Sequence, residues 1–258
     1  MSLSTVTNFA HTFFGYGNLN APVWFVGMEE GGGETRDEIE ARLRSWEAGG
    51  RSPVVDIVEF GRESGLKGHL QWFEGEKPPL QTTWKQLIRV VLSSRGEPAT
   101  ASSVRAYQRD GFARSDGHEC LLELLPMPSP SVGEWRYGDW YPLPWLRDRK
   151  AYREHLLEHR VERLQQLVAE REPAAVVFYS RSYLDEWCRV MDVPRDELVE
   201  TVIVRRAERE VKAWIHENDE TTFIVTSHPS AFGVTNSYFE DIGRILPSRT
   251  RHISHQSL

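Results

Sequence analysis

The sequence contains few cysteines and no long apolar run, and these absences exclude several classes of protein. Only two of its 258 residues are cysteines, Cys120 and Cys188, too few for a disulfide framework, a four-cysteine zinc site or a cysteine-ligated iron–sulfur cluster. No stretch reaches the ~18 apolar residues that span a bilayer, and residues 1–15 contain no Lys or Arg to begin a signal peptide. We therefore predict a cytoplasmic protein with reduced thiols and with no metal, cofactor or membrane partner.

An excess of positive charge is also missing. The chain carries 31 Lys and Arg residues against 38 Asp and Glu residues, a formal net charge of −7. Nucleic-acid-binding proteins derive much of their affinity from Lys and Arg that meet phosphates, so this balance argues against broad, non-specific binding to duplex DNA. It leaves room for a small local contact surface. The length and the globular composition, 40% hydrophobic and 27% charged, predict one domain over residues 1–258.

The clearest structural pattern is a parallel α/β unit near the start of the chain. An apolar, β-rich run at 22–27 precedes the glycine-rich turn 28–33 and the helix-favouring segment 34–43. An unbroken apolar strand is typical of a sheet buried on both faces, so we predict a three-layer α/β/α fold with a short central parallel sheet. Further strands are expected at 120–125, 174–179 and 222–226, helices at 84–92, 147–171, 182–190 and 236–246, an extra hairpin at 201–204 and 211–216, and irregular loops at 49–80 and 126–145.

Three expected strand ends carry charged or polar residues, and ligands of open parallel sheets lie at such ends. The first, Gly27-Met28-Glu29-Glu30-Gly31, matches no nucleotide-binding glycine pattern; its glutamates either face solvent in a loop or supply a carboxylate that orients water. The second is Glu123-Leu124-Leu125-Pro126, where Glu123 either faces water on an edge strand or is buried with a partner. The third is His228-Pro229-Ser230, in which the histidine alone would be an ordinary turn residue.

Taken together and in order, the three turns resemble the uracil-DNA glycosylase superfamily. That family has a strand followed by Gly-x-x-x-Gly, a polar base-reading residue shortly before a proline, and a late His-Pro-Ser. The greatest similarity is to its single-strand-selective monofunctional branch, whose first motif is Gly-Met-Asn-Pro-Gly. Here Glu29 and Glu30 replace the Asn and Pro, and Glu123 replaces the Asn that distinguishes uracil. Segments 83–96 and 176–187 are also similar to the family's first helix and to its third strand and helix.

The resemblance implies roles in cleaving an N-glycosidic bond, a reaction that forms a cationic sugar and an anionic leaving base. Glu29 or Glu30 would act on the sugar side, and His228 would donate a hydrogen bond to the base. An ionised Glu123 only accepts hydrogen bonds, so it would favour a base with an exocyclic amine. The other implied contacts are Gly27, Met28 and Gly31 around the ligand, Phe73, Trp72 or an aromatic residue of 135–145 as a stacking platform, Ser230 with Arg244, Arg249 and Arg251 near a phosphate, and Asn236, which has a family counterpart nearby.

The sequence leaves three functions open. The first is a glycosylase that removes a damaged or deaminated base from single-stranded DNA or from a damaged duplex. The second is a catalytically silent module with a glycosylase fold that binds a base, a nucleotide or single-stranded nucleic acid; the acidity of the chain and the loss of both Asn positions favour it. The third is a hydrolase of free nucleosides.

Overall fold

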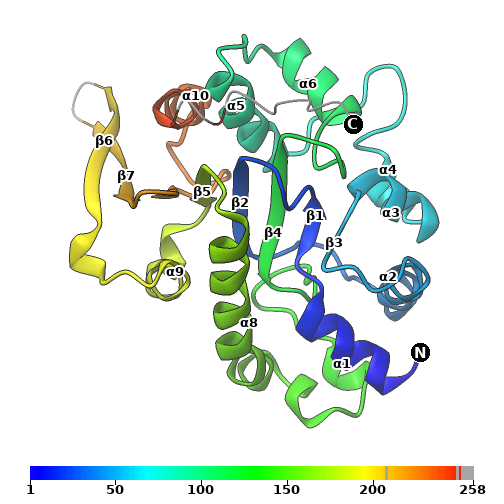
Figure 1. Cartoon of the computed structure of the whole chain (residues 1–258). Coiled ribbons are helices and arrows are strands. Elements are labelled where there is room, and N and C mark those ends of the chain that lie inside the picture. Colours follow the sequence, from blue (N-terminus) through cyan, green and yellow to red (C-terminus); the bar gives the residue numbers. More distant parts are fainter. Residues whose placement is uncertain (207–208, 248–249, 251–258) are drawn as a thin grey trace.

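The computed structural model describes residues 1–206, 209–247 and 250, in which eight strands form one mixed sheet (Figure 1). The strands are β1 (Gly15–Gly17), β2 (Val23–Glu29), β3 (Val54–Val55), β4 (Glu119–Leu125), β5 (Ala175–Phe178), β6 (Val199–Arg206), β7 (Arg209–Glu217) and β8 (Thr222–Val225). Their order across the sheet is β3-β1-β4-β2-β5-β8-β7-β6. The four central strands run parallel, whereas β1 and β7 pair antiparallel with β4 and β8. The α/β class is confirmed, and the sheet is wider and more mixed than predicted.

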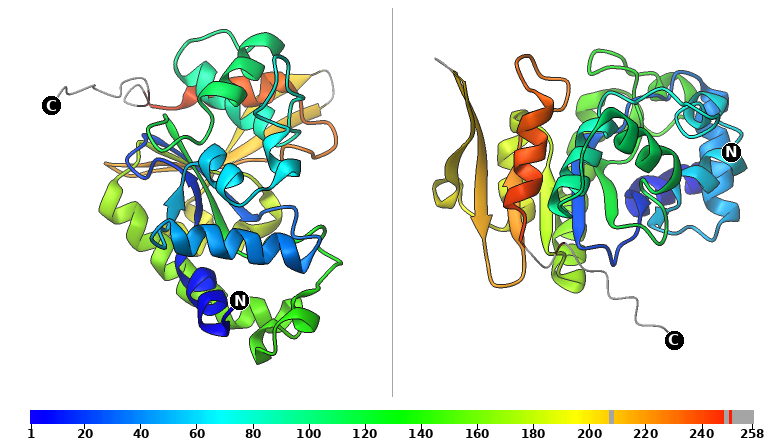
Figure 2. Two further views of the ribbon diagram at one scale, coloured as in Figure 1. Left: turned by 90° about the vertical axis from the view of Figure 1, so that its right-hand side faces the viewer. Right: turned by 90° about the horizontal axis from the view of Figure 1, so that it is seen from above.

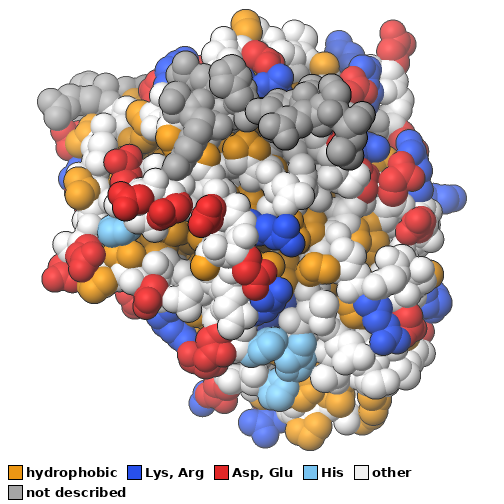
Figure 3. Space-filling model, in the orientation of Figure 1, with side chains coloured by type: hydrophobic (Ala, Val, Ile, Leu, Met, Phe, Trp, Pro, Cys, Tyr) orange, Lys and Arg blue, Asp and Glu red, His pale blue; other side chains and the backbone are white. Residues whose placement is uncertain are grey.

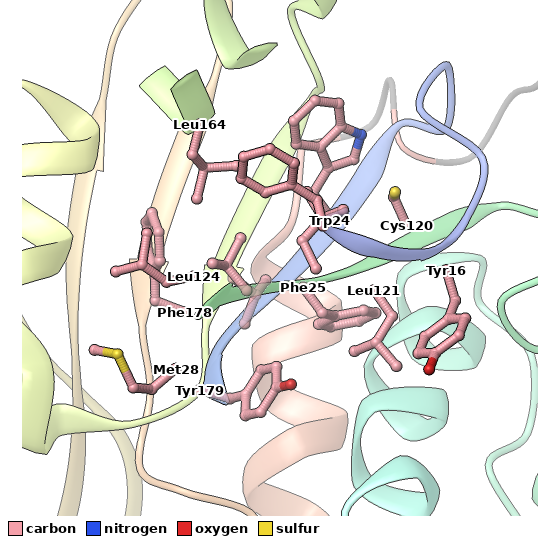
Figure 4. Packing of buried hydrophobic residues seen from close by; sticks show 14 of the residues in the cluster. Tyr16, Trp24, Phe25, Met28, Cys120, Leu121, Leu124, Leu164, Phe178 and Tyr179 are labelled. Atoms are coloured by element: carbon pink, nitrogen blue, oxygen red, sulfur yellow. The ribbon is translucent and has the colours of Figure 1, made fainter. Parts of the chain in front are cut away.

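Helices cover both faces of this sheet (Figures 1 and 2). Figure 4 shows Phe25 and Leu121 on the side that faces α5 and α10, whereas Trp24 and Leu164 of α8 lie on the other side. None of the helices in the described part of the chain is both long and apolar enough to cross a membrane. The α-helices are α1 (Leu3–Thr12), α2 (Arg36–Ala48), α3 (Ile57–Glu63), α4 (Lys67–Leu70), α5 (Trp84–Ser94), α6 (Ala101–Asp110), α7 (Tyr137–Trp140), α8 (Arg149–Arg171), α9 (Leu184–Met191) and α10 (Asn236–Ile245), and short 3₁₀ turns lie at Pro144–Leu146, Arg181–Tyr183 and Arg195–Glu197.

The order of the parallel strands reverses at β2. The chain leaves β2, returns as β4 on one side of it, and then returns through α8 as β5 on the other side. At such a reversal the loops after the two neighbouring strands diverge and leave a crevice at their carboxyl ends. The fold therefore places a binding crevice where β2 and β5 end.

A buried arginine ties α8 to the part of β4 that faces this crevice. Arg160 is fully buried and donates from Nη2 and Nε to the backbone carbonyl oxygens of Glu123 (2.9 Å) and Leu124 (2.8 Å). Its guanidinium also lies over the Phe14 ring, 3.4 Å from the centroid. A buried guanidinium without hydrogen-bond partners would be costly. The two charge-assisted hydrogen bonds therefore hold the Arg160 side chain and the β4 backbone in one arrangement. Arg160 thus holds the Glu123 backbone in place from behind the sheet.

Two predicted loops are more ordered than expected. Residues 49–80 contain β3, α3 and α4, where the many glycines had indicated irregular structure. The proline-rich segment 126–145 was predicted as an exposed loop, but it packs back on the body with Tyr137 and Tyr141 1% and 2% exposed. Prolines restrict regular structure there to the short α7 and the start of a 3₁₀ turn, but they do not prevent burial, because aromatic side chains still gain by leaving water.

Candidate functional site

The four parallel strands end around one cavity of about 340 Å³. Its lining comes from residues 28–31 at the end of β2, 129–132 after β4, 179–183 after β5, and His228 after β8. Figure 4 shows Met28 and Tyr179, two of the lining residues, at this end of the sheet. Segments that are up to 200 residues apart in the chain therefore meet at the crevice that the strand order creates, and the predicted residues Met28, Glu29, Glu30, Gly31 and His228 all line it.

Glu29 is a largely buried carboxylate with one oxygen engaged. Its side chain is 12% exposed, and Oε2 accepts an ion-paired hydrogen bond from Nη1 of Arg149. Oε1 is buried and has no hydrogen-bond partner among the described residues. Burial raises the pKa of Glu29, while the hydrogen bond and the charge of Arg149 oppose that rise. The interpretation of Glu29 as a solvated loop residue is wrong, and Oε1 is left to a ligand or water.

Glu30 has both carboxylate oxygens engaged by the protein. Arg42 approaches Oε1 and Oε2 at 3.1–3.2 Å, and the Tyr16 hydroxyl donates to Oε2 at 2.8 Å. Arg42 itself is buried at 5% exposure. This bidentate pair joins the end of β2 to α2 and β1. The two neighbouring glutamates, which the sequence could not rank, are thus distinguished by their partners.

Glu123 is buried within the sheet, and it contacts the lining residue Tyr179 without being part of the cavity lining. It is 9% exposed, its Oε1 accepts from the Tyr179 hydroxyl at 2.5 Å, and Oε2 has no hydrogen-bond partner in the described chain. Burial raises its pKa to about 8, so the protonated form predominates at neutral pH. A neutral carboxyl offers a donor as well as an acceptor, so the accept-only role expected for Glu123 belongs to its ionised form alone. The prediction of an edge position facing water is wrong.

Gly27 is required by this buried pair. A Cβ at Gly27 would lie 2.3 Å from Oε2 of Glu123 and 2.3 Å from the hydroxyl of Tyr179. Real Cβ atoms do not approach other atoms so closely. The glycine in the first motif therefore makes room for the buried side chains of Glu123 and Tyr179 rather than for the ligand directly.

His228 presents one ring nitrogen to its own loop. The backbone N–H of Ser230 donates to Nδ1 at 3.2 Å, and the Ser230 hydroxyl lies 2.8 Å from the same nitrogen. An N–H can only donate, so Nδ1 accepts and a neutral ring carries its proton on Nε2. Burial lowers the pKa of His228, which favours the neutral ring. Nε2–H is therefore the donor that His228 can offer in the cavity.

A second hollow of about 230 Å³ shares His228, Ser180 and Ser182 with the cavity. Its other lining includes Arg181 and the loop 231–234. Phe232 on this loop is 92% exposed. The lining combines the Arg181 guanidinium with the Glu210 carboxylate and with serine hydroxyls, and the exposed aromatic ring beside them is a large apolar surface.

Several predicted contact residues lie elsewhere. Phe73 is buried against Trp84, with ring centroids 5.3 Å apart, and does not line the cavity. Asn236 accepts a hydrogen bond from Gln86 at 3.0 Å and joins α10 to α5. Ser230 contacts His228 but is not part of the lining. Arg244, which was predicted to lie near a phosphate, pairs with Asp241 and Glu240. Arg249 and Arg251, predicted for the same role, lie outside the described residues.

Sequence reasoning missed Tyr179 and Arg149. Tyr179 directly follows β5, and Glu29 is the last residue of β2, so the strand-end rule that found Glu29 could also have found Tyr179. Arg149 lies 120 positions from Glu29 in the chain, and no local pattern marks it.

Both cysteines are buried and form no disulfide. Within residues 1–206, 209–247 and 250, no group of three or more His, Cys, Asp and Glu could hold a metal ion.

Comparisons with protein-family models, with curated proteins and with solved structures found no match for this chain. The functional assignment therefore depends on the residues of the cavity and on their chemistry.

Proposed function

We propose that the protein is a DNA glycosylase that hydrolyses the N-glycosidic bond of a damaged or deaminated nucleotide, with a uracil-DNA glycosylase-like fold. The observation that carries the proposal is that Glu29 and His228, from the ends of β2 and β8, line the same cavity of about 340 Å³. A carboxylate and a neutral hydrogen-bond donor are the two groups that this reaction needs on opposite sides of the bond that breaks.

Glu29 acts on the sugar side of the reaction. Its carboxylate stabilises positive charge at C1′ as the bond to the base nitrogen breaks and the electron pair leaves with the base. Oε1, which no described protein group engages, orients the attacking water and accepts its proton as the oxygen bonds to C1′. Glu30 cannot take this role in the same state, because Arg42 and Tyr16 occupy both of its oxygens.

His228 acts on the base side. A hydrogen bond from Nε2–H to a base oxygen stabilises the negative charge that develops on the leaving base. The neutral ring suits this role, since its Nδ1 is already held by Ser230.

The surface favours a local contact with nucleic acid over wide coverage. Figure 3 shows Lys and Arg side chains scattered among Asp and Glu side chains, without a continuous basic area on this face. The exposed Phe232 beside the cavity is suited to stack on or separate bases, which a flipped-out target requires. Unstacking the target base costs the least free energy in a single-stranded or already distorted target.

The test is a panel of oligonucleotides that carry different damaged or deaminated bases, single-stranded and duplex, scored for abasic sites. Free nucleosides with the same bases are assayed for base release in parallel. We expect wild-type protein to produce abasic sites in at least one oligonucleotide and Glu29→Gln to produce none. Release from nucleosides alone would replace the proposal by a nucleoside hydrolase.

The second candidate is a catalytically silent module that binds a base, a nucleotide or single-stranded nucleic acid. The observation that favours it is the ion pair of Glu29 with Arg149, because the guanidinium occupies one of the two carboxylate oxygens that could otherwise act on water. Saturable binding of panel members by fluorescence anisotropy, with no abasic sites in any of them, would establish this reading and overturn the glycosylase.

A further inference from the structure

The side chain of Arg149 lies between Glu29 and the loop 129–134, and it contacts both. Arg149 is the first residue of α8 and is mostly buried, its side chain 19% exposed. One guanidinium nitrogen, Nη1, donates to Oε2 of Glu29. The other, Nη2, donates to the Ser129 hydroxyl at 2.6 Å and to the backbone carbonyl oxygens of Ser131 (2.9 Å) and Glu134 (3.0 Å).

We propose that Arg149 is the positioning residue of the cavity: it fixes the Glu29 carboxylate with Oε1 toward the ligand and holds the loop 129–134 against the end of β2. The inference rests on the proposed function, since it assigns Glu29 a reactive role. It goes beyond that function by naming a residue outside the cavity lining that sets the geometry and charge of the reactive group.

Arg149 determines which oxygen of Glu29 is available. Because Nη1 occupies Oε2, only Oε1 lacks a partner among the described groups. Arg149 also supports the ionised form: its hydrogen bond and its charge lower the pKa of Glu29 against the rise caused by burial. Arg153, one helical turn later, lowers that pKa less and pairs instead with Glu186 at 2.8 Å. Removing the positive charge of Arg149 should therefore change the pKa of Glu29 more than removing that of Arg153.

Arg149 also fixes one side of the cavity. Ser129 and Ser131, whose hydroxyl and carbonyl it contacts, are lining residues. The backbone N–H of Ser129 donates to the carbonyl oxygen of Glu30 at 3.0 Å, so the loop and the end of β2 are joined twice. The guanidinium lies over the Trp135 ring, 5.1 Å from its centroid. A planar fork that donates in two directions while it stacks on an aromatic ring is a property of arginine that lysine lacks.

The experiment compares Arg149→Met, Arg149→Lys and the matched control Arg153→Met in the full-length chain. The first readout is the titration midpoint of Glu29, followed by carboxyl ¹³C NMR of protein labelled at glutamate and assigned with Glu29→Gln. We expect the Glu29 pKa to rise in Arg149→Met, to rise less in Arg153→Met, and to return toward wild type in Arg149→Lys. This readout needs no turnover.

The second readout is the pH profile of base release on the best substrate of the panel. In Arg149→Met the acidic limb moves to higher pH, because the ionised form of Glu29 is required and forms later, and kcat falls about 10²-fold through misplacement while KM changes little. Arg149→Lys restores the position of the acidic limb without restoring kcat in full.

The outcomes distinguish the positioning role of Arg149 from the glycosylase activity of the protein. An unchanged Glu29 midpoint in Arg149→Met overturns the inference, as does an equal rise in Arg153→Met. A raised midpoint without base release by wild-type protein supports the positioning role and overturns the glycosylase. If Arg149→Met does not fold, Arg149→Lys decides: a wild-type acidic limb with a reduced kcat supports the inference, and a wholly wild-type profile overturns it.

Discussion

The two buried glutamates of β4 have different surroundings at the two ends of the strand. Glu119, at the amino end, accepts from the Tyr107 hydroxyl at 2.7 Å and from the Ala113 backbone N–H at 2.7 Å, one donor for each oxygen. Glu123, toward the carboxyl end, accepts from Tyr179 through one oxygen only. Buried polar atoms are normally satisfied, so the two glutamates differ in that Glu119 has a donor for each oxygen and Glu123 has a donor for one.

Glu29 follows the same rule on the neighbouring strand. It too has one engaged oxygen and one buried oxygen without a partner among the described residues. Both incomplete carboxyl groups lie toward the carboxyl ends of parallel strands, next to the crevice created by the strand order. The comparison teaches that the position of a buried glutamate along the strand, and not its burial alone, separates the carboxyl group with a complete set of partners from those with an incomplete set.

The largest expected effect is at Glu29. Glu29→Gln abolishes base release, because an amide neither stabilises the cationic sugar nor accepts the proton of water. The free energy of unfolding, measured in urea, stays near the wild-type value. Glu30→Gln is the control: it weakens the pair with Arg42 and leaves base release in place. An equal loss of base release in Glu29→Gln and Glu30→Gln would show that the number of hydrogen-bond partners does not distinguish the roles of the two glutamates.

His228→Ala is the next largest. Loss of the Nε2–H donor slows base release by roughly 10²–10³-fold, or ~3–4 kcal/mol of transition-state stabilisation, as for other oxyanion donors. Single-turnover rates with saturating enzyme measure the chemical step. A rate within twofold of wild type would show that His228 is only a turn residue.

The sequence predicts the fold better than the partners within the site. Apolar runs locate β2, β4, β5 and β8 because these strands are buried on both faces. The α6 helix was missed since only Val104 and Gln108 of it are buried, so no apolar stripe marks it. Glu29, Glu123 and His228 were found from strand ends. Their partners Arg149 and Tyr179 come from other elements, and such long-range pairing has no local signal.

A smaller effect concerns pH and stability. Folding raises the pKa of Glu123 from 4.5 to about 8, so the folded protein keeps a proton that the unfolded chain releases. This contribution to the free energy of unfolding is complete below about pH 4.5 and is lost progressively as the pH rises to about 8. Glu123→Gln removes that loss, so its stability relative to wild type rises between pH 5 and pH 8.

Urea unfolding at several pH values measures this difference. Glu119→Gln is the comparison, because burial raises the pKa of Glu119 only to about 7 and its pH-dependent window ends earlier. A stability difference between Glu123→Gln and wild type that is the same at pH 5 and pH 8 would show that Glu123 is ionised in the folded protein throughout this range.

The most direct measurement is the base preference of Glu123→Asn at pH 9, determined as the ratio of abasic sites formed from uracil and from the best panel base. At this pH the wild-type carboxyl, with a pKa of about 8, is mostly ionised and only accepts hydrogen bonds, whereas an asparagine amide still donates. The account predicts that the ratio shifts toward uracil in the variant. An unchanged ratio, together with full activity of Glu29→Gln and His228→Ala, would contradict the assignment of the incomplete carboxyl groups to a glycosylase site.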